Sequence, residues 1–74
     1  MDIRRVVGEN IRFIREKRKL SQEALAAKAE ISISYMGYIE RGEKAITIII
    51  LERVAKVLKV SPGLLLDRDA HRKV

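Results

Sequence analysis

The stretch "QEALAAKAEISISYMGYIER" (residues 22–41) contains two short amphipathic segments whose apolar residues recur at helical spacing. Ser21 and Ser32 each precede one segment and can cap it as a helix. Only Glu30 and Ile31 separate the first segment from Ser32. The positions predicted to be buried between the two helices are Leu25, Ala29, Ile31, Met36 and Ile39, with Ala26 where the helices nearly touch. Two short helices joined by so tight a turn predict a helix-turn-helix.

Further helices are predicted on both sides of this motif. Before it, Asp2 can cap a first helix with an apolar stripe formed by Val6, Val7, Ile11 and Ile14. After it, Gly42 suits the left-handed conformation beyond a helix end, and Thr47 can cap a fourth helix, "IIILERVAKVLK". Its expected inward residues are Ile48, Leu51, Val54, Ala55 and Leu58. Ser61 followed by Pro62 predicts a brief fifth helix, "GLLL".

Length and composition support one small all-α domain. The 74 residues include one Pro, four Gly and no Cys, so neither a disulfide nor a thiolate-bound metal supplements the core. We expect a compact five-helix domain over residues 1–74 with a central helix-turn-helix and a tail, "DRDAHRKV", that is frayed from about residue 67. No apolar run approaches the roughly 20 residues that span a bilayer, and no signal-like stretch occurs, so the sequence predicts a cytoplasmic protein with no membrane partner.

Basic residues dominate the charge. Sixteen Lys and Arg against ten Asp and Glu give a formal net charge of +6, which favours nucleic acid as a polyanionic partner, although a merely soluble basic surface has the same composition. An enzyme is not predicted, because the single histidine, His71, lies in the tail and the carboxylates are scattered over helix surfaces. No glycine-rich phosphate loop or metal-ligand spacing occurs, so we expect no cofactor and no metal.

Three segments together resemble the Xre-like helix-turn-helix family, which includes the lambdoid phage repressors and the small controller proteins of restriction-modification systems. The segments are "IRFIREKRKLSQEALAAKA", "SISYMGYIERGE" and "LERVAKVLKVSPGLLL", and they cover nearly the whole chain. The resemblance implies a sequence-specific transcriptional regulator that binds double-stranded DNA. The length of the chain and the stretch "SYMGYIERG" make it most similar to the controller proteins.

The chain departs from the family pattern at three places. Glu30 stands where the family usually has a glycine with a left-handed backbone, at a cost of about 1 kcal/mol. The loop "GEKAIT" replaces a common Asn-Pro-containing loop, which changes the backbone available for phosphate contacts. Ile49 and Ile50 stand where the family often has polar residues, and they are ordinary core, an aggregation liability or a dimer seam.

The third helix is expected to expose Ile33, Ser34, Gly37 and Tyr38, at positions that face base edges in the family. Between Ile33 and the helix end it holds no Arg, Lys, Asn or Gln, the side chains that most often read bases. Ile33 can instead contact a thymine methyl group, while Ser34 and Tyr38 can form hydrogen bonds. Gly37 allows close approach. The alternative is that Ile33 and Tyr38 complete the core or a partner interface. We expect modest direct readout that favours A·T-containing sites, with DNA shape contributing much of the rest.

Phosphate contacts are expected around the same helix. By resemblance, Gln22 braces the DNA backbone from the start of the second helix, where free N–H groups and the helix dipole attract an anion. The other candidates are Tyr35, Arg41, Lys19 and Lys44. Any one of the basic residues could instead be a plain solvated charge. Arg4, Arg5 and residues 17–19 are expected to steer DNA without specific contact.

Two further sets of residues are expected to have structural roles. Arg15 and Glu40 occupy positions that pair in some lambdoid repressors, so the resemblance implies an ion pair that orients one helix against another. Because one such domain contacts only a few base pairs, we expect a homodimer on a near-palindromic operator. The candidate dimer-interface residues are Ile49, Ile50, Leu64, Leu65 and Leu66, and the alternative is that most of these leucines are monomer core.

The sequence leaves two functions open. The first is a dimeric transcriptional regulator, either repressor or activator, with RNA polymerase as a candidate partner through Glu23, although Glu23 also fits a plain solvated face. The second is a protein-interaction module of antitoxin or coactivator type, which uses the apolar fourth helix on a protein partner and for which DNA binding is secondary. A steep fall of DNA affinity with rising salt favours the first function over the second.

Overall fold

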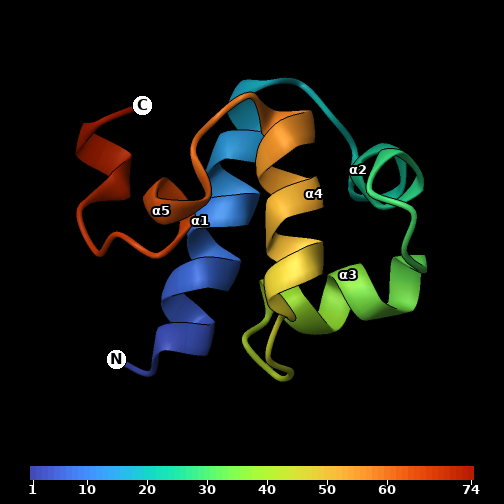
Figure 1. The fold of residues 1–74 in the computed structure, drawn as a ribbon, viewed down its shortest axis with the longest axis horizontal. Coiled ribbons are helices and arrows are strands. Elements are labelled where there is room, and N and C mark those ends of the chain that lie inside the picture. Colours follow the sequence, from blue (N-terminus) through green and yellow to red (C-terminus); the bar gives the residue numbers. More distant parts are fainter.

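A computed structural model describes residues 1–74 as five α-helices and a final 3-10 turn, without strands (Figure 1). The helices are α1 (Ile3–Lys17), α2 (Gln22–Lys28), α3 (Ile33–Glu40), α4 (Ile48–Leu58) and α5 (Pro62–Leu65), and the turn is η1 (Ala70–Arg72). The predicted all-α, five-helix fold class is confirmed. None of the helices combines the length and the apolar character needed to cross a membrane.

Short polar side chains begin the first four helices, as predicted. Each accepts a hydrogen bond from a backbone N–H in the first turn of its helix, and the capping residues are Asp2, Ser21, Ser32 and Thr47. Each cap satisfies an N–H group that the helix itself leaves unpaired. Ser61 precedes α5 but makes no such hydrogen bond, and the fixed φ of Pro62 sets the first turn there.

Left-handed backbone occurs where the chain leaves a helix. Gly42, just after α3, has a φ of 73°, as predicted. In the turn of the helix-turn-helix, Glu30 has a φ of 62°, so a residue with a Cβ adopts the conformation for which the family uses glycine. A backbone hydrogen bond of 3.0 Å from the Ile31 amide to the Ala26 carbonyl closes this turn. The local strain is therefore offset by a satisfied turn and by the burial on both sides of it.

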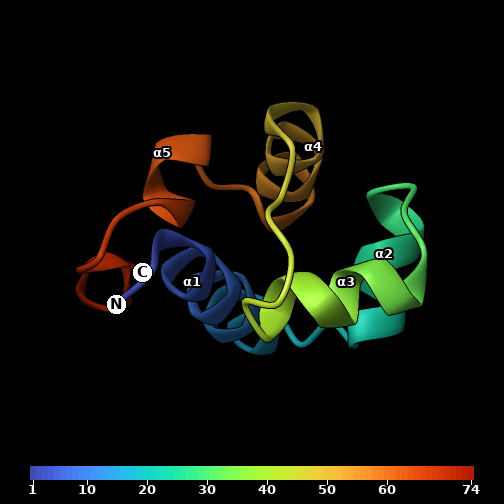
Figure 2. The same cartoon turned by 90° about the horizontal axis from the view of Figure 1, so that it is seen from below.

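One cluster of 13 buried side chains connects all five helices. Its members are Val7, Ile11, Ile14, Leu25, Ala26, Ala29, Met36, Ile39, Leu51, Val54, Ala55, Leu58 and Leu65. The residues predicted to be buried between α2 and α3 belong to it, with Ile31 half-buried against it. α1 packs most extensively against α3, and α2 packs against α3 as well. Figures 1 and 2 show α2 and α3 together at one side of the molecule, and α5 with both chain termini at the other.

Two predictions about apolar residues are wrong. Ile48, expected to face the core, is 84% exposed, because nothing packs against the first residue of α4. Leu65, a candidate for the dimer interface, is completely buried in the core cluster and is therefore unavailable to a second copy of the chain. Leu64 is half-buried against the same cluster, whereas Leu66 is 44% exposed.

The C-terminal segment packs against α1, which corrects the prediction of a frayed tail. Asn10 is buried in α1 and donates hydrogen bonds from Nδ2 to the carbonyl oxygens of Leu65 (3.0 Å) and Asp67 (2.8 Å). A hydrogen bond from Lys73 lowers the pKa of the Asp67 carboxyl group. Ala70 is completely buried. The prediction failed because the partners of Asn10 lie 55 and 57 residues later in the chain, beyond any local pattern.

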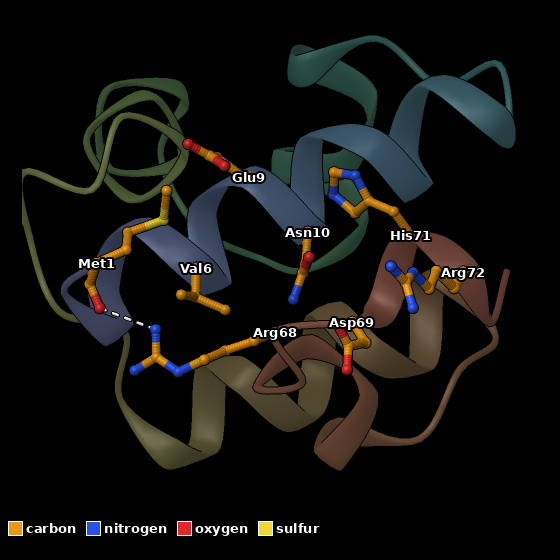
Figure 3. A pocket seen from close by; sticks show the side chains of 8 residues that line it. All are labelled: Met1, Val6, Glu9, Asn10, Arg68, Asp69, His71 and Arg72. Carbon is orange, nitrogen blue, oxygen red and sulfur yellow. Dashed lines mark hydrogen bonds between the residues drawn. The ribbon is translucent and has the colours of Figure 1, made fainter.

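The tail also stacks on α1 through two rings. His71 lies over Phe13 with 4.0 Å between ring centroids and 9° between ring planes. Beside this stack is an open hollow of about 410 Å³, lined by Met1, Val6, Glu9, Asn10, Arg68, Asp69, His71 and Arg72 (Figure 3). Arg68 reaches across it and donates to the Met1 carbonyl at 2.8 Å. Acidic and basic side chains both line this hollow, so its charge favours neither anions nor cations.

Gly8→Ala should lower the free energy of unfolding by about 2 kcal/mol or more. A Cβ at position 8 would lie 2.3 Å from the carbonyl oxygen of Ile39 and 2.7 Å from that of Glu40, and both are backbone atoms at the end of α3. Gly63→Ala is the matched control, because nothing lies within 4 Å of its Cβ position. Urea unfolding measures both variants, and equal stabilities would contradict the close contact between α1 and α3.

Candidate nucleic-acid interface

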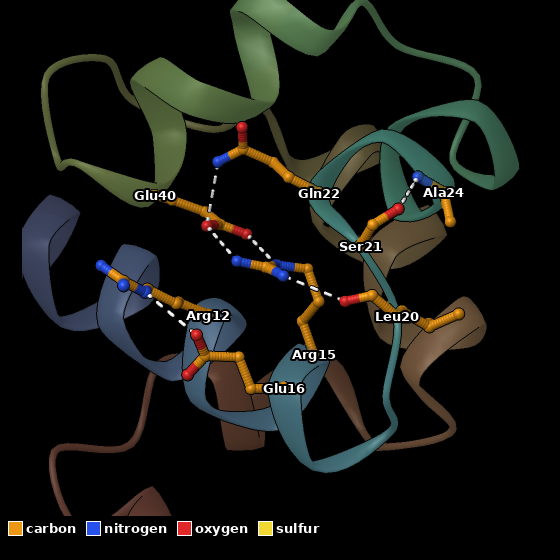
Figure 4. A network of polar contacts seen from close by, with 8 residues as sticks. All are labelled: Arg12, Arg15, Glu16, Leu20, Ser21, Gln22, Ala24 and Glu40. Carbon is orange, nitrogen blue, oxygen red and sulfur yellow. Dashed lines mark hydrogen bonds and ion pairs between the residues drawn. The ribbon is translucent and has the colours of Figure 1, made fainter.

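A buried ion pair joins α1 to the end of α3 (Figure 4). Arg15 donates from Nε to Glu40 Oε2 at 2.7 Å and from Nη2 to Oε1 at 3.0 Å. The two side chains are only 12% and 4% exposed. The hydrogen bond to Glu40 raises the pKa of Arg15 above its ordinary value, although burial opposes this, and the guanidinium stays charged. Two parallel N–H groups facing one carboxylate give a pair with a single preferred orientation.

The same two side chains also reach α2 and the turn before it. Arg15 donates from Nη1 to the Leu20 carbonyl at 3.0 Å, and Gln22 donates from Nε2 to Glu40 Oε1 at 3.1 Å. Figure 4 shows the guanidinium and the carboxylate between α1 and the start of α2. No buried side-chain nitrogen or oxygen lacks a hydrogen-bond partner. One ion pair therefore sets the positions of both helices of the helix-turn-helix relative to α1.

The outer face of α3 carries a shallow hollow of about 280 Å³. Its lining residues are Gln22, Ile33, Ser34, Gly37, Tyr38 and Arg41. The hollow thus brings together all four residues expected to read bases and two of those expected to contact phosphate. Ile33, Ser34 and Tyr38 are exposed there. Gln22 is half-buried, because its amide group is turned toward Glu40.

Gly37 is buried, which corrects the expectation that α3 exposes it. Arg41 follows four residues later and therefore lies on the same side of the helix. Its side chain folds back over the glycine: a Cβ at position 37 would lie 3.1 Å from Nη1 of Arg41 and 3.8 Å from Cζ and Nη2. The missing side chain of Gly37 thus leaves room for the Arg41 guanidinium.

Two basic side chains lie against the ring of Tyr38. Arg41 Cζ is 5.2 Å and Lys44 Nζ is 4.5 Å from the ring centroid, both within the range of a cation–π interaction. Arg41 also donates from Nε to Glu43 Oε1 at 3.0 Å. Positive charge therefore gathers at the C-terminal end of α3, beside the hollow.

The other expected phosphate contacts and steering residues lie outside the hollow. Tyr35 is half-buried, and its hydroxyl donates to the Ala45 carbonyl at 3.1 Å, which holds the loop after α3. Lys19 is exposed in the turn between α1 and α2. Arg4 and Arg5 each lie within 4 Å of a neighbouring carboxylate, at 3.0 and 3.7 Å. The charge expected to steer DNA from the start of α1 is thus partly neutralised.

A second exposed feature is the start of α4. Ile49 is 64% exposed, next to Ile48, which is 84% exposed, and Ile50 is half-buried against the core. The sequence predicts Ile49 and Ile50 as interface candidates and, by its spacing, places Ile48 in the core, whereas the structure exposes Ile48. The signal in the sequence that could have indicated the exposure of Ile48 is the run of three isoleucines at the start of this helix. Elsewhere, no group of three or more His, Asp or Glu side chains is placed to hold a metal ion.

The comparisons with known proteins agree with this geometry. Residues 11–65 match the Helix-turn-helix family, and the chain belongs to the Xre-like regulators of that family. It is 40% identical to the control protein C.SmaI of Serratia marcescens over an alignment of 69 residues. That alignment covers 93% of this chain and 82% of C.SmaI.

Two solved structures are similar in both fold and sequence. The restriction-modification controller protein C.AhdI from Aeromonas hydrophila gives a TM-score of 0.80 at 30% identity, over 86% of this chain and 96% of C.AhdI. SinR, the master regulator for biofilm formation, was solved in complex with DNA and gives a TM-score of 0.79 at 39% identity, over 82% of this chain and 98% of SinR. The chain is thus a helix-turn-helix transcriptional regulator.

Glu40→Ala should lower the free energy of unfolding by about 3 kcal/mol, because it leaves the Arg15 guanidinium buried without its carboxylate. Glu40→Gln is the matched control: it keeps the size and one acceptor oxygen, so its loss should be smaller. Thermal unfolding and DNA affinity are measured together. Unchanged values of both in Glu40→Ala would show that the pair does not orient α3.

Proposed function

We propose that the chain binds double-stranded DNA sequence-specifically, as a homodimer on a near-palindromic operator, and regulates transcription from there. The observation that carries this proposal is the hollow on α3, where exposed side chains expected to read bases lie beside Gln22 and Arg41. α3 is held from behind by the Arg15–Glu40 pair, so its outer face is presented on a rigid support. SinR, a structural neighbour, was solved with DNA bound.

The roles within the hollow follow from side-chain chemistry. Ile33 is exposed and apolar, which suits contact with a thymine methyl group, and Ser34 can donate or accept a hydrogen bond at a base edge. Tyr38 offers a hydroxyl group, while its ring already supports two cations. Gly37 acts by leaving space rather than by contacting a base.

Phosphate contacts surround these readers. The amide nitrogen of Gln22 carries two hydrogens, and only one is used by Glu40, so the other can donate to a phosphate oxygen. Lys44 makes no ion pair and lies beside the reading face, while Lys19 and Tyr35 flank it. Arg41 belongs to this group by charge, but its position over Gly37 favours a different role, which is argued below.

The type of regulator we propose is a restriction-modification controller protein. C.AhdI is such a protein and C.SmaI is named as a control protein, and the matches cover 96% and 82% of their lengths. RNA polymerase is a candidate partner through Glu23, which is exposed in the first turn of α2.

A homodimer follows from the limited reach of one domain and from the apolar start of α4. One recognition helix contacts only a few base pairs, so two copies about one DNA turn apart are needed for a specific site. We assign the dimer seam to Ile48, Ile49 and Leu66, with Ile50 and Leu64 at its edge, because these apolar side chains are left exposed or half-buried.

The exposed isoleucines also favour a second candidate function. A protein-interaction module of antitoxin or coactivator type would use Ile48 and Ile49 on a different protein, with DNA binding secondary. The two functions differ in their response to salt, because only DNA binding releases counterions from phosphates.

The proposed function predicts steep salt dependence. Of the phosphate-contact candidates, the two lysines Lys19 and Lys44 carry charge that neutralises phosphates, which makes four such contacts in a dimer. Affinity for the operator should therefore fall at least about a hundredfold between about 50 and 200 mM salt. Duplexes selected from a random pool should show two related half-sites about one helical turn apart. Fluorescence anisotropy measures the affinity. A flat salt response with no selected sequence would overturn DNA regulation and support the protein-interaction module.

Ile49→Glu should shift the chain from dimer to monomer at micromolar concentration, because it places a carboxylate at the centre of the assigned seam. Its operator affinity should then fall at least about tenfold, since the two half-sites are no longer held together. Ala27→Glu, on an exposed position of α2, is the control for the added charge. Sedimentation velocity measures the oligomeric state of both variants and of the unmodified chain. A purely monomeric unmodified chain would contradict the homodimer.

A further inference from the structure

The reading face of α3 is short of groups that identify a base. Apart from Arg41, the side chains at the hollow that belong to α3 or its end are Ile33, Ser34 and Tyr38, which supply one methyl-rich surface and two hydroxyl groups. Neither hydroxyl makes the paired hydrogen bonds that identify a guanine or an adenine. The guanidinium group at this face comes from Arg41, the residue that caps α3 at its C-terminus.

We infer that Arg41 reads a G·C base pair in each half-site, and is not one of the phosphate contacts. This inference rests on the proposed function, because it names the base that the same surface recognises. The first support is position. The guanidinium lies over Gly37, in the hollow shared with Ile33, Ser34 and Tyr38, and so stands among the side chains that face base edges rather than on the flank of the helix.

The second support is the set of hydrogen-bond donors that remain free. Nε of Arg41 is committed to Glu43 at 3.0 Å, while Nη1 and Nη2 make no hydrogen bond. These two nitrogens present parallel N–H groups at the end of a planar fork. Guanine offers two acceptors, O6 and N7, on its major-groove edge, and an arginine fork matches that pair.

The third support is electrostatic. The carboxylate of Glu43 lies beside the guanidinium and offsets part of its positive charge, so Arg41 attracts a phosphate less than an unpaired arginine would. A base edge carries only partial charges, so the Glu43 carboxylate weakens directed hydrogen bonds to a base less than it weakens a phosphate contact. Glu43 is thus a positioning residue: it holds Nε and leaves Nη1 and Nη2 without a hydrogen-bond partner.

Gly37 makes this arrangement available. A Cβ at position 37 would approach Nη1 of Arg41 to 3.1 Å, and the three atoms nearest to it all belong to that flexible side chain. Gly37→Ala therefore shifts the guanidinium by a few tenths of an ångström, and no backbone atom is among those three. Alanine also has the higher helix propensity, so the variant should fold at least as stably as the unmodified chain.

The test begins with the operator selected by the unmodified chain. Each G·C pair of a half-site is replaced singly by A·T, and affinities are measured for the unmodified chain, Arg41→Lys and Gly37→Ala. The unmodified chain should lose at least about tenfold at one G·C pair. Arg41→Lys should lose that preference and Gly37→Ala should weaken it, each at the same pair while the other preferences are kept. Arg41→Lys should keep the salt dependence because its charge is retained. Thermal unfolding should show no loss of stability in either variant.

Two control variants separate this role from a general effect. Arg53→Lys makes the same change at an exposed arginine of α4, outside the hollow on α3, and Gly63→Ala makes the same change at an open glycine. Neither should alter base preference. An equal loss of affinity on every duplex, or an unchanged preference in Arg41→Lys and Gly37→Ala, would overturn the inference while leaving the proposed function intact. An unmodified chain that selects no sequence would overturn both.

Discussion

The bidentate pair between Arg15 and Glu40 is the interaction on which the arrangement of the helix-turn-helix depends. Apolar packing between short helices rich in alanine tolerates small rotations, because Ala26 and Ala29 give little side chain to interlock. A guanidinium facing a carboxylate at 2.7 and 3.0 Å tolerates much less. Burying both charges costs several kcal/mol, and the further hydrogen bonds to Leu20 and from Gln22 offset part of that cost. The pair thus contributes orientation more than net stability.

Local chemistry is the reason that so much of the fold could be predicted from the sequence. Side chains such as Ser21, Ser32 and Thr47 bond to backbone groups within the next turn, so their effect does not depend on distant residues. The left-handed backbone of Glu30 is instead what the resemblance implies, because the family usually has a glycine at that position. Within the candidate site, helical spacing places Ile33, Ser34 and Tyr38 on one face, and the structure exposes all three.

What could not be predicted depends on neighbours that no local pattern reveals. The spacing of α4 assigns Ile48 to the inward face, but spacing does not tell whether any other element extends as far as the first turn. Asn10 ties down the tail through carbonyl groups more than 50 residues away, and Leu65 is buried by the packing of that same segment. Gly37 is covered by an arginine that lies outside the helix it caps. In each case tertiary contact overrides periodicity.

The lack of Arg, Lys, Asn and Gln within α3 is therefore linked to the position of the Arg41 guanidinium over Gly37. A longer side chain at position 37 would occupy the space that the guanidinium now fills. A base-contacting side chain can therefore come from position 37 or from Arg41, but not from both. An arginine usually loses much rotamer freedom on binding, but here Tyr38 and Glu43 already restrict it in the free protein. For the base contact that we propose, that restriction lowers the entropy that Arg41 loses on binding. An acidic residue beside a DNA-binding surface, otherwise unfavourable, is accounted for by the orientation that it imposes.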